Sequence, residues 1–110
     1  MNKIKIIAEA GINHNGEINL AKKLIDIAAK AKADYIKFQF YKTNLLVSDH
    51  AKLAPYQRKN VKNHTSQLQL LKKYELSNLD IKNLLKYSKK KKIKFLCTPF
   101  DTSSLKYLKS

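Results

Sequence analysis

The order of strand-like and helix-like segments is the feature that most constrains this chain. An apolar run predicts a buried strand over residues 3–8, strict alternation predicts a second strand over 34–40, and a further apolar run predicts a third over 93–98. Helical patterns lie between these strands. Units that alternate in this way specify a parallel sheet with right-handed crossovers, so the sequence predicts an α/β fold.

The helices are predicted from the spacing of their apolar residues. A second helix is expected over 66–74 and a third over about 79–91, where Ser77 and Asp80 have the spacing of a capping box. The first helix begins after Gly16 and carries one apolar stripe, formed by Leu20, Ala21, Leu24, Ile25 and Ala28.

A long segment from about residue 41 to 64 has no clear period and contains Pro55. Loops of this length in compact domains usually carry function, so we predict an irregular functional loop here. Near the other end of the chain, Asp101 and Thr102 begin a further helix. No repeat and no Gly/Ser-rich linker divides the 110 residues, which have the size of one small domain.

Charge is the strongest bias in the composition, since 23 basic minus 8 acidic residues gives +15. Arg58 is the only arginine, whereas proteins that read bases and phosphates rely on the planar fork of arginine. The lysines fall largely on predicted polar helix faces and at helix ends, which favours a solvated surface and no nucleic-acid partner. A lysine-rich nucleic-acid-binding α/β module stays open as an alternative of a different class.

The sequence does not indicate export or a membrane. No stretch approaches the roughly 18 apolar residues that cross a bilayer, and residues 1–7 lack the apolar region of a secretory signal. The single cysteine, Cys97, has no partner for an internal disulfide and is typical of a small core residue. We therefore expect a cytoplasmic protein with no membrane partner.

Residues that could bind a ligand or take part in a reaction lie where the predicted strands end. The first strand is followed by Glu9, the second carries Lys37 and Gln39, and the third ends at Thr98 with Phe100 just beyond. In parallel α/β folds the carboxyl ends of the strands form the ligand crevice, both in open sheets and in (β/α)8 barrels. The sequence thus predicts one rim where a carboxylate, an ammonium and small polar groups receive an anionic substrate.

Structural explanations exist beside the functional ones. Glu9 also fits an exposed turn, whereas Lys37 is harder to explain in this way because a central parallel strand is normally apolar on both faces. A lone histidine such as His14 is more often structural or exposed, and no second histidine lies at metal-binding spacing. Gly11 and Gly16 do not form a dinucleotide fingerprint, which disfavours a nicotinamide enzyme.

Five blocks of the chain resemble one family, the sialic acid synthases, which include N-acetylneuraminate synthase and the legionaminic and pseudaminic acid synthases. Residues 6–16 are similar to the opening signature of that family, and 35–39 to its second-strand motif. Residues 54–57 and 66–68 resemble its loop and the following helix, and 95–101 its third-strand motif. The blocks occur in order and at the expected spacings from about Ile4 onward.

The resemblance implies a (β/α)8 TIM barrel, of which residues 1–110 would be an incomplete N-terminal portion with about three β/α units. The C-terminal barrel half and the antifreeze-like domain of full-length members would be absent from this chain. Carried onto matching positions, Glu9 would be the acidic catalytic residue. Lys37 and Thr98 would contact phosphoenolpyruvate, and Gln39 and Phe100 would help form the acceptor-sugar pocket.

The implied reaction condenses phosphoenolpyruvate with an N-acetylated amino sugar, most simply N-acetylmannosamine, to a sialic-acid-type nonulosonic acid with release of phosphate. A legionaminic or pseudaminic acid synthase is the alternative within the family. The resemblance also implies a divalent metal, Mn²⁺ or Mg²⁺, whose ligands would lie downstream of this chain, and a homodimer for the full-length protein. A stand-alone fragment that binds a partner through its open barrel edge is a third possibility.

Two departures from the family pattern concern the backbone. Lys32 and Lys92 stand where the family usually has glycine, at predicted helix ends that favour a left-handed conformation. A lysine adopts that conformation at a cost of roughly 1 kcal/mol, so we expect a modest loss of stability rather than of chemistry. With about three strands of eight, the polypeptide alone is expected to be inactive, with an open edge at its third strand.

Overall fold

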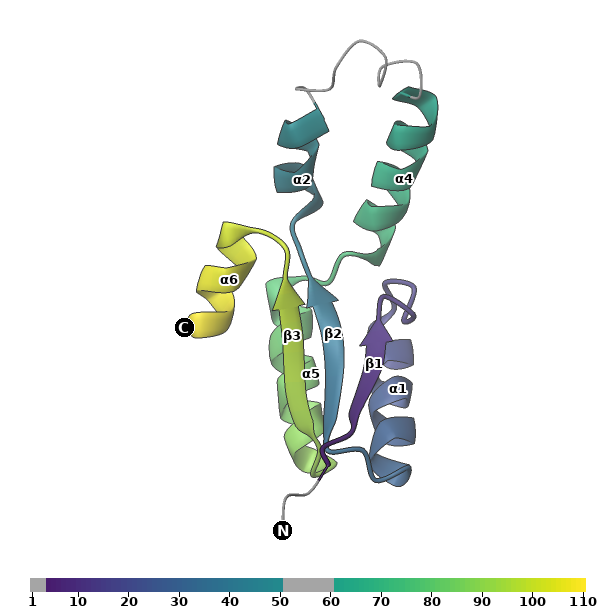
Figure 1. The fold of residues 1–110 in the computed structure, drawn as a ribbon, viewed down its shortest axis with the longest axis vertical. Coiled ribbons are helices and arrows are strands. Elements are labelled where there is room, and N and C mark those ends of the chain that lie inside the picture. Colours follow the sequence, from purple (N-terminus) through teal and green to yellow (C-terminus); the bar gives the residue numbers. More distant parts are fainter. Residues whose placement is uncertain (1–3, 51–60) are drawn as a thin grey trace.

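The computed structural model describes residues 4–50 and 61–110. Its centre is a parallel sheet of three strands in the order β1-β2-β3, formed by β1 (Ile7–Gly11), β2 (Tyr35–Phe40) and β3 (Lys94–Pro99). Both neighbouring pairs are parallel, with Ile36 opposite Ala8 on one side and opposite Phe95 on the other. The predicted α/β fold with a parallel sheet is confirmed (Figure 1).

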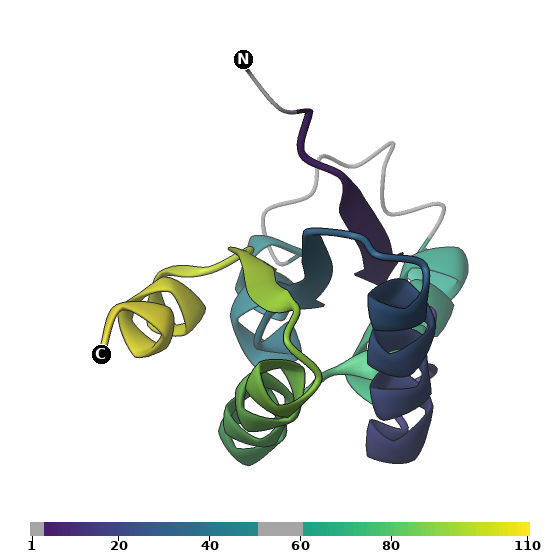
Figure 2. The same cartoon turned by 90° about the horizontal axis from the view of Figure 1, so that it is seen from below.

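Two helices, α1 (Ile18–Lys30) and α5 (Asn78–Lys90), cover one face of this sheet (Figure 2). Their apolar stripes pack against the side chains that β2 directs toward them, and Ile36, Phe38 and Phe40 are at most 1% exposed. Burial of each such side chain contributes roughly 1.5–3 kcal/mol. The core therefore lies between β2 and the two helices, and it fixes which side of each strand faces away.

The opposite face of the sheet carries no helix among the described residues (Figure 2). In an open doubly wound sheet the strand order reverses and helices cover both faces. Here the strands follow their sequence order and their helices lie on one side, which is the arrangement of consecutive units in a β/α barrel. The uncovered face corresponds to the side that such a barrel turns inward.

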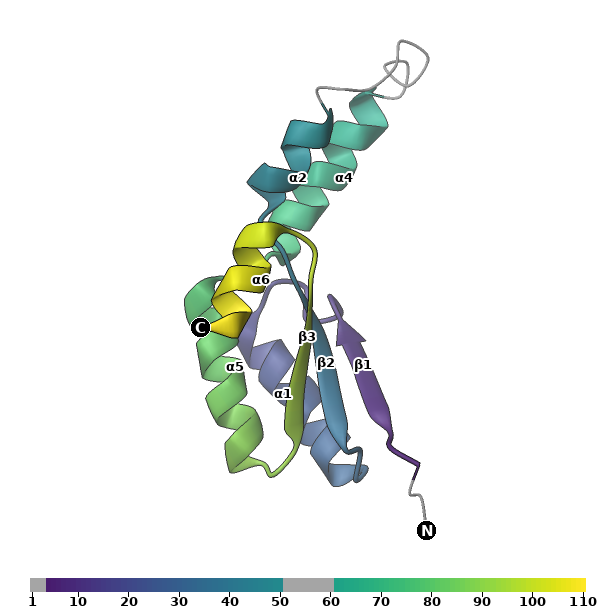
Figure 3. The same cartoon turned by 60° about the vertical axis from the view of Figure 1, so that its left-hand side comes forward.

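Two helices, α2 (Thr43–His50) and α4 (Val61–Tyr74), extend beyond the carboxyl ends of the strands (Figures 1 and 3). The prediction of an irregular segment over 41–64 is therefore wrong at both of its ends, and the motif at 54–57 lies outside the described residues. A contact between distant segments explains the start of α2, because the Glu75 carboxylate accepts from the N–H of Thr43 at 2.8 Å and caps the first turn of this helix.

Tyr41 joins this pair of helices to the sheet. Its hydroxyl donates to the carbonyl oxygen of Leu71 in α4 at 2.7 Å, and its side chain is 2% exposed. Burial, followed by the nearby Glu75 and Tyr74, raises the pKa of Tyr41 to about 12. The hydroxyl accordingly stays protonated and keeps its role as a donor.

The first strand differs from its prediction in position and in burial. Pairing with β2 begins at Ile7, and Ile4, Ile6 and Ile7 are 90%, 58% and 48% exposed. The expected buried strand over 3–8 is thus wrong, because β1 is an edge strand and the alternation places Ile7 on the uncovered face. Ala8 and Ala10 instead face the helices and pack in or against the core.

The helix ends follow the sequence closely. Ser77 and Asp80 form the predicted capping box at the start of α5, and Asp101 caps α6 (Thr102–Lys109). Lys32 and Lys92 have φ angles of 64° and 61°, which confirms the left-handed conformation expected at both positions. In the part of the chain that the structure describes, no helix is long and apolar enough to span a bilayer.

Candidate functional site

The register of β1 against β2 brings the carboxylate of Glu9 to the ammonium of Lys37. The two residues are direct partners in the parallel pair, and the Lys37 Nζ lies 2.9 Å from the Glu9 Oε2. Their side chains are 35% and 51% exposed on the uncovered face of the sheet. The expectation that the ammonium of Lys37 points away from the core and beside Glu9 is confirmed.

The ion pair between Lys37 and Glu9 is too exposed for its presence to be explained by a contribution to the stability of the fold. A pair of this exposure stabilises a fold by only about 0.2–1 kcal/mol. A charged residue in the middle strand of a parallel sheet has to be solvated or paired, whereas an apolar residue would suit most such strands better. An ammonium has three N–H donors. Lys37 directs one of them at Glu9, so the other two can bind an anionic ligand.

Gly11 shapes the end of β1 next to this pair. A β-bulge lies between Glu9 and Gly11, and Gly11 has a φ of 55°, where a residue without a side chain is favoured. A Cβ atom at this position would lie 3.7 Å from both the Glu9 Oε1 and the Gln39 Nε2. The carboxylate and the amide therefore flank the same small space at the carboxyl end of the sheet.

Thr98 and Phe100 come to the same end of the sheet through β3. Thr98 is the direct partner of Gln39 in the register, and it is half-buried. Phe100 lies one residue beyond β3, where its N–H donates to the carbonyl oxygen of Phe40 at 3.0 Å and its side chain is 52% exposed. All five predicted residues thus lie along one edge, but only Glu9 and Lys37 are in direct contact.

Asp101 ties the ends of β2 and β3 together, which sequence reasoning missed. Its carboxylate accepts from the N–H of Lys42 at 2.7 Å, from the N–H of Ser104 at 2.7 Å and from the hydroxyl of Ser104 at 2.9 Å. Burial alone raises the pKa of Asp101, but these hydrogen bonds and the nearby Lys42 lower the pKa below its usual value. The pattern Asp-x-x-Ser after a strand signals the helix cap, whereas the bond to Lys42 has no signal in the sequence.

His14 anchors the turn between β1 and α1. It is fully buried, its Nδ1 accepts from the N–H of Gly16 at 2.9 Å, and its ring lies 6.0 Å from that of Phe38. Burial lowers the pKa of His14, although the charge of Asp80 raises it in part. A neutral imidazole that accepts at Nδ1 carries its proton at Nε2. The buried ring and its bond to Gly16 fit the structural interpretation of this histidine, while its Nε2 has no hydrogen-bond partner among the described residues.

The two free N–H donors of Lys37 give this site the means to bind an anion. Among the residues that the structure describes, no three His, Cys, Asp or Glu side chains gather closely enough to hold a metal ion. Glu9 is the carboxylate at the rim, and it is engaged with Lys37.

Comparison with known proteins gives consistent results. The model of the NeuB family matches residues 24–110. N,N'-diacetyllegionaminic acid synthase from Campylobacter jejuni subsp. jejuni is 53% identical over 108 residues, which are 98% of this chain and 32% of that protein. The synthase of the same name from Legionella pneumophila is 41% identical, over 94% of this chain and 29% of that protein.

A solved structure shows the same arrangement. The N-acetylneuraminic acid (sialic acid) synthetase from Leptospira borgpetersenii serovar Hardjo-bovis, solved in complex with citrate, is 38% identical with a TM-score of 0.78. The match covers 98% of this chain and 33% of that protein. The chain thus spans about a third of the length of the curated relatives and of the solved structure that it matches.

Proposed function

The chain belongs to the NeuB family, and on that premise we propose that it forms the first three β/α units of a barrel synthase. The synthase joins phosphoenolpyruvate to an N-acetylated amino sugar and yields a sialic-acid-type nonulosonic acid. One observation carries this proposal: the Glu9–Lys37 ion pair lies on the uncovered sheet face, in a chain 53% identical to a nonulosonic acid synthase. Parallel β/α proteins bind their ligands at this end of the strands.

The proposed roles follow from the charge and position of each side chain. Lys37 binds the anionic donor, because its ammonium is a compact charge that suits a phosphate or carboxylate. Thr98, across from the neighbouring Gln39, adds a hydroxyl donor to the same ligand. Gln39 and Phe100 form part of the sugar pocket, with an amide for polar groups and an exposed ring for an apolar face.

Glu9 is proposed to hold or move a proton at the reacting carbons. The donor's enol carbon forms a bond to the aldehyde carbon of the sugar, whose oxygen takes up a proton. Water adds to the resulting cationic carbon and loses a proton. The carbon–oxygen bond to phosphate then breaks, the new hydroxyl gives up its proton to become the ketone, and phosphate leaves. A carboxylate 2.9 Å from the donor-binding ammonium lies within reach of these proton transfers.

Two acceptors fit this class of reaction. N-acetylmannosamine is the simpler one, and it would give N-acetylneuraminic acid. The names of the relatives from Campylobacter jejuni and Legionella pneumophila favour an acceptor with two acetamido groups instead. Both sugars therefore belong in the test.

Partners and location are part of the same proposal. The whole protein would act in the cytoplasm as a homodimer, with phosphoenolpyruvate and the amino sugar as its ligands, and without nucleic acid or membrane. A divalent Mn²⁺ or Mg²⁺ would bind outside this chain and polarise the aldehyde. The nucleic-acid alternative predicts an affinity that falls steeply with salt, which a titration with duplex DNA between 50 and 200 mM salt would reveal.

A chimera tests the proposed function directly. Residues 1–110 replace the matching third of the Campylobacter jejuni synthase, and phosphate release from phosphoenolpyruvate is measured with N-acetylmannosamine and with a diacetamido sugar. We expect turnover with at least one of the sugars and a loss of about 100-fold or more in Glu9→Gln. Glu17→Gln, an exposed carboxylate near the start of α1, is the control and keeps its activity.

Two results would refute the proposal. One is a folded chimera that releases no phosphate with either sugar, and the other is a Glu9→Gln chimera with full activity. The 110-residue chain without the rest of the synthase is expected to release no phosphate, since three strands enclose no barrel. Turnover by that chain alone at a rate typical of enzymes would contradict the barrel interpretation.

A further inference from the structure

The turn between β1 and α1 lies at the carboxyl end of the sheet but has no part in the proposed reaction. Three successive backbone hydrogen bonds of 3.0–3.1 Å run through this turn. The first joins the N–H of Asn13 to the carbonyl oxygen of Ala10 in β1, and the last joins the N–H of Glu17 to that of His14. The turn is therefore tied firmly to the strand that carries Glu9.

His14 is the buried centre of this turn. Its Nδ1 accepts from the N–H of Gly16 at 2.9 Å, and its ring lies 6.0 Å from that of Phe38. Phe38 stands between Lys37 and Gln39 on β2, so the ring supports the strand from the core side at the level of these two site residues. An apolar side chain could fill the same place without burying an Nε2–H that has no partner among the described residues. Only an acceptor such as Nδ1 can hold Gly16.

Gly16 is the point at which the same turn meets the end of α4. It has a φ of 79°, and a Cβ atom here would overlap the carbonyl oxygen of Lys73 and lie 3.5 Å from the Cα of Tyr74. Lys73 belongs to the last turn of α4, where carbonyl groups have no partner within the helix. Backbone thus packs directly on backbone, and glycine is the residue that permits this contact without a displacement of α4.

The end of α4 is also the base of the arm that α2 and α4 form beyond the strands (Figure 3). Near this base, the hydroxyl of Tyr41 donates to the carbonyl oxygen of Leu71, and Glu75 caps Thr43 at the start of α2. Leu76 follows directly and is fully buried in the core. Since α4 has 14 residues and is about 21 Å long, a small rotation at its base moves the far end of the arm by much more.

We propose that His14 and Gly16 are positioning residues, which lock the base of α4 onto the β1–α1 turn and so fix the arm relative to Gln39. This inference rests on the proposed function, because the arm begins shortly after Gln39, on the side of the rim where the sugar is proposed to bind. The donor side is independent of the lock, since the pairing of β1 with β2 places Glu9 beside Lys37. The lock therefore affects the affinity for the acceptor sugar and not that for phosphoenolpyruvate.

Steady-state kinetics of the chimera that carries residues 1–110 test this role. Gly16→Ala adds a methyl group at the contact with α4, and we expect the KM for the sugar to rise about tenfold. The KM for phosphoenolpyruvate and kcat should change by less than about threefold. His14→Leu should have the same effect, because it removes the acceptor for the N–H of Gly16. His14→Asn should raise the sugar KM by less than about threefold, since its amide oxygen can replace Nδ1 as the acceptor.

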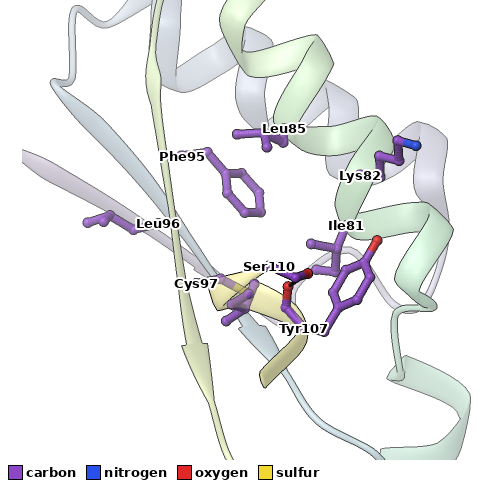
Figure 4. Close-up of a pocket in the computed structure, with 9 residues that line it drawn as sticks. Ile81, Lys82, Leu85, Phe95, Leu96, Cys97, Tyr107 and Ser110 are labelled. Carbon is purple, nitrogen blue, oxygen red and sulfur yellow. Dashed lines mark hydrogen bonds between the residues drawn. The ribbon is translucent and has the colours of Figure 1, made fainter. Parts of the chain in front are cut away.

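Two control variants separate the lock from a general loss of stability. Asn15→Ala places alanine at a φ of 56°, so it strains the backbone of the same turn without adding an atom toward α4. Leu85 and Phe95 line a hollow between α5, β3 and α6 on the helix-covered side of the sheet (Figure 4). Leu85→Ala removes apolar contacts among these three elements and leaves the turn and α4 intact. Both controls should lower the midpoint of thermal unfolding but leave the sugar KM unchanged.

Hydrogen exchange followed by mass spectrometry tests the lock in the same variants without the need for activity. Peptides over residues 67–76 should exchange about tenfold faster in Gly16→Ala and in His14→Leu than in the parent chimera. In Asn15→Ala and Leu85→Ala the same peptides should keep the exchange rate of the parent.

Unchanged exchange over residues 67–76 in Gly16→Ala would overturn the lock, and so would equal increases of the sugar KM in Gly16→Ala and Asn15→Ala. An equal increase of both KM values in Gly16→Ala would refute the assignment to the sugar side. An active parent whose Gly16→Ala variant keeps its sugar KM supports the proposed function and refutes this inference. A folded parent that releases no phosphate refutes the proposed function, and hydrogen exchange then supports or refutes the lock by itself.

Discussion

The two faces of β2 differ although their residues alternate along a single strand. Ile36, Phe38 and Phe40 point toward α1 and α5 and are at most 1% exposed, whereas Lys37 is 35% exposed on the other face. The covered face is uniformly apolar and determines stability. The uncovered face carries an ammonium paired with a carboxylate from the next strand, which contributes little to stability. The comparison indicates that the core and the candidate site lie on opposite faces of the same strand.

Among single substitutions, the largest loss of stability is expected on the covered face of β2. Phe38→Ala removes a fully buried ring from the centre of the core, and we expect it to destabilise the chain by about 3–5 kcal/mol, a large share of the stability of a small domain. Urea denaturation followed by circular dichroism measures the loss. Phe100→Ala, at a ring that is 52% exposed, changes stability by less than about 1 kcal/mol. Equal losses would break the distinction between the faces.

A smaller loss is expected where the ends of β2 and β3 are joined. Asp101→Ala removes three hydrogen bonds to a carboxylate, and we expect a loss of about 2 kcal/mol. Because the folded pKa of Asp101 is lowered, its stabilising effect is present above the unfolded pKa of about 3.9 and is lost as pH falls through the folded value. Denaturation at pH 7 and at pH 3 should show a smaller mutational loss in acid. The same loss at both pH values would contradict this assignment.

His14 gives a pH dependence in a higher range. Burial lowers its folded pKa, so the folded chain is favoured while the imidazole is neutral, above the unfolded pKa of about 6.5. Stability should therefore fall as pH drops below about 6.5. Replacement by glutamine should flatten that part of the curve and cost about 1 kcal/mol at pH 8 through the altered bond to Gly16. A wild-type curve that is level from pH 8 to pH 5 would rule out this role.

The smallest change in stability is expected at the amino ends of β2 and β3. Lys32 and Lys92 hold left-handed backbones in the turns before β2 and β3, and Lys→Gly at each should stabilise the chain by about 0.5–1 kcal/mol. The midpoint of thermal unfolding measures the gain, with Lys23→Gly in the interior of α1 as a control that loses stability. A loss at Lys32 or Lys92 would show that these lysines make contacts that outweigh the backbone strain.

The two faces of β2 and the start of α5 could be predicted because short-range sequence patterns specify them. The strict alternation over 34–40 identified both faces of β2, and the spacing of Ser77 and Asp80 identified a helix cap. The cysteine in β3 was expected to be a small core residue. It packs against the core, and burial raises the pKa of the Cys97 thiol to about 12.

What could not be predicted depends on contacts between distant segments. The start of α2 is capped by Glu75, which lies 32 residues away, and the bond from Lys42 to Asp101 spans 59 residues. Ile4 and Ile6 are exposed because they lie before Ile7, where pairing with β2 begins, and a run of apolar residues does not reveal where pairing starts. The Glu9–Lys37 pair was foreseen because parallel strands end together, but its distance required the register of the two strands.

Phosphate release by the chimera with two lysine variants on the uncovered face tests the account most directly. Lys37 and Lys94 share that face, but Lys94 lies at the amino end of β3, with its ammonium 5.5 Å from the ring centre of Tyr35. Lys37→Met should lower phosphate release by about 100-fold or more, and Lys94→Met should change it by less than about threefold. Similar rates in the two variants would contradict the claim that Lys37 and Glu9 form the reactive end of the sheet.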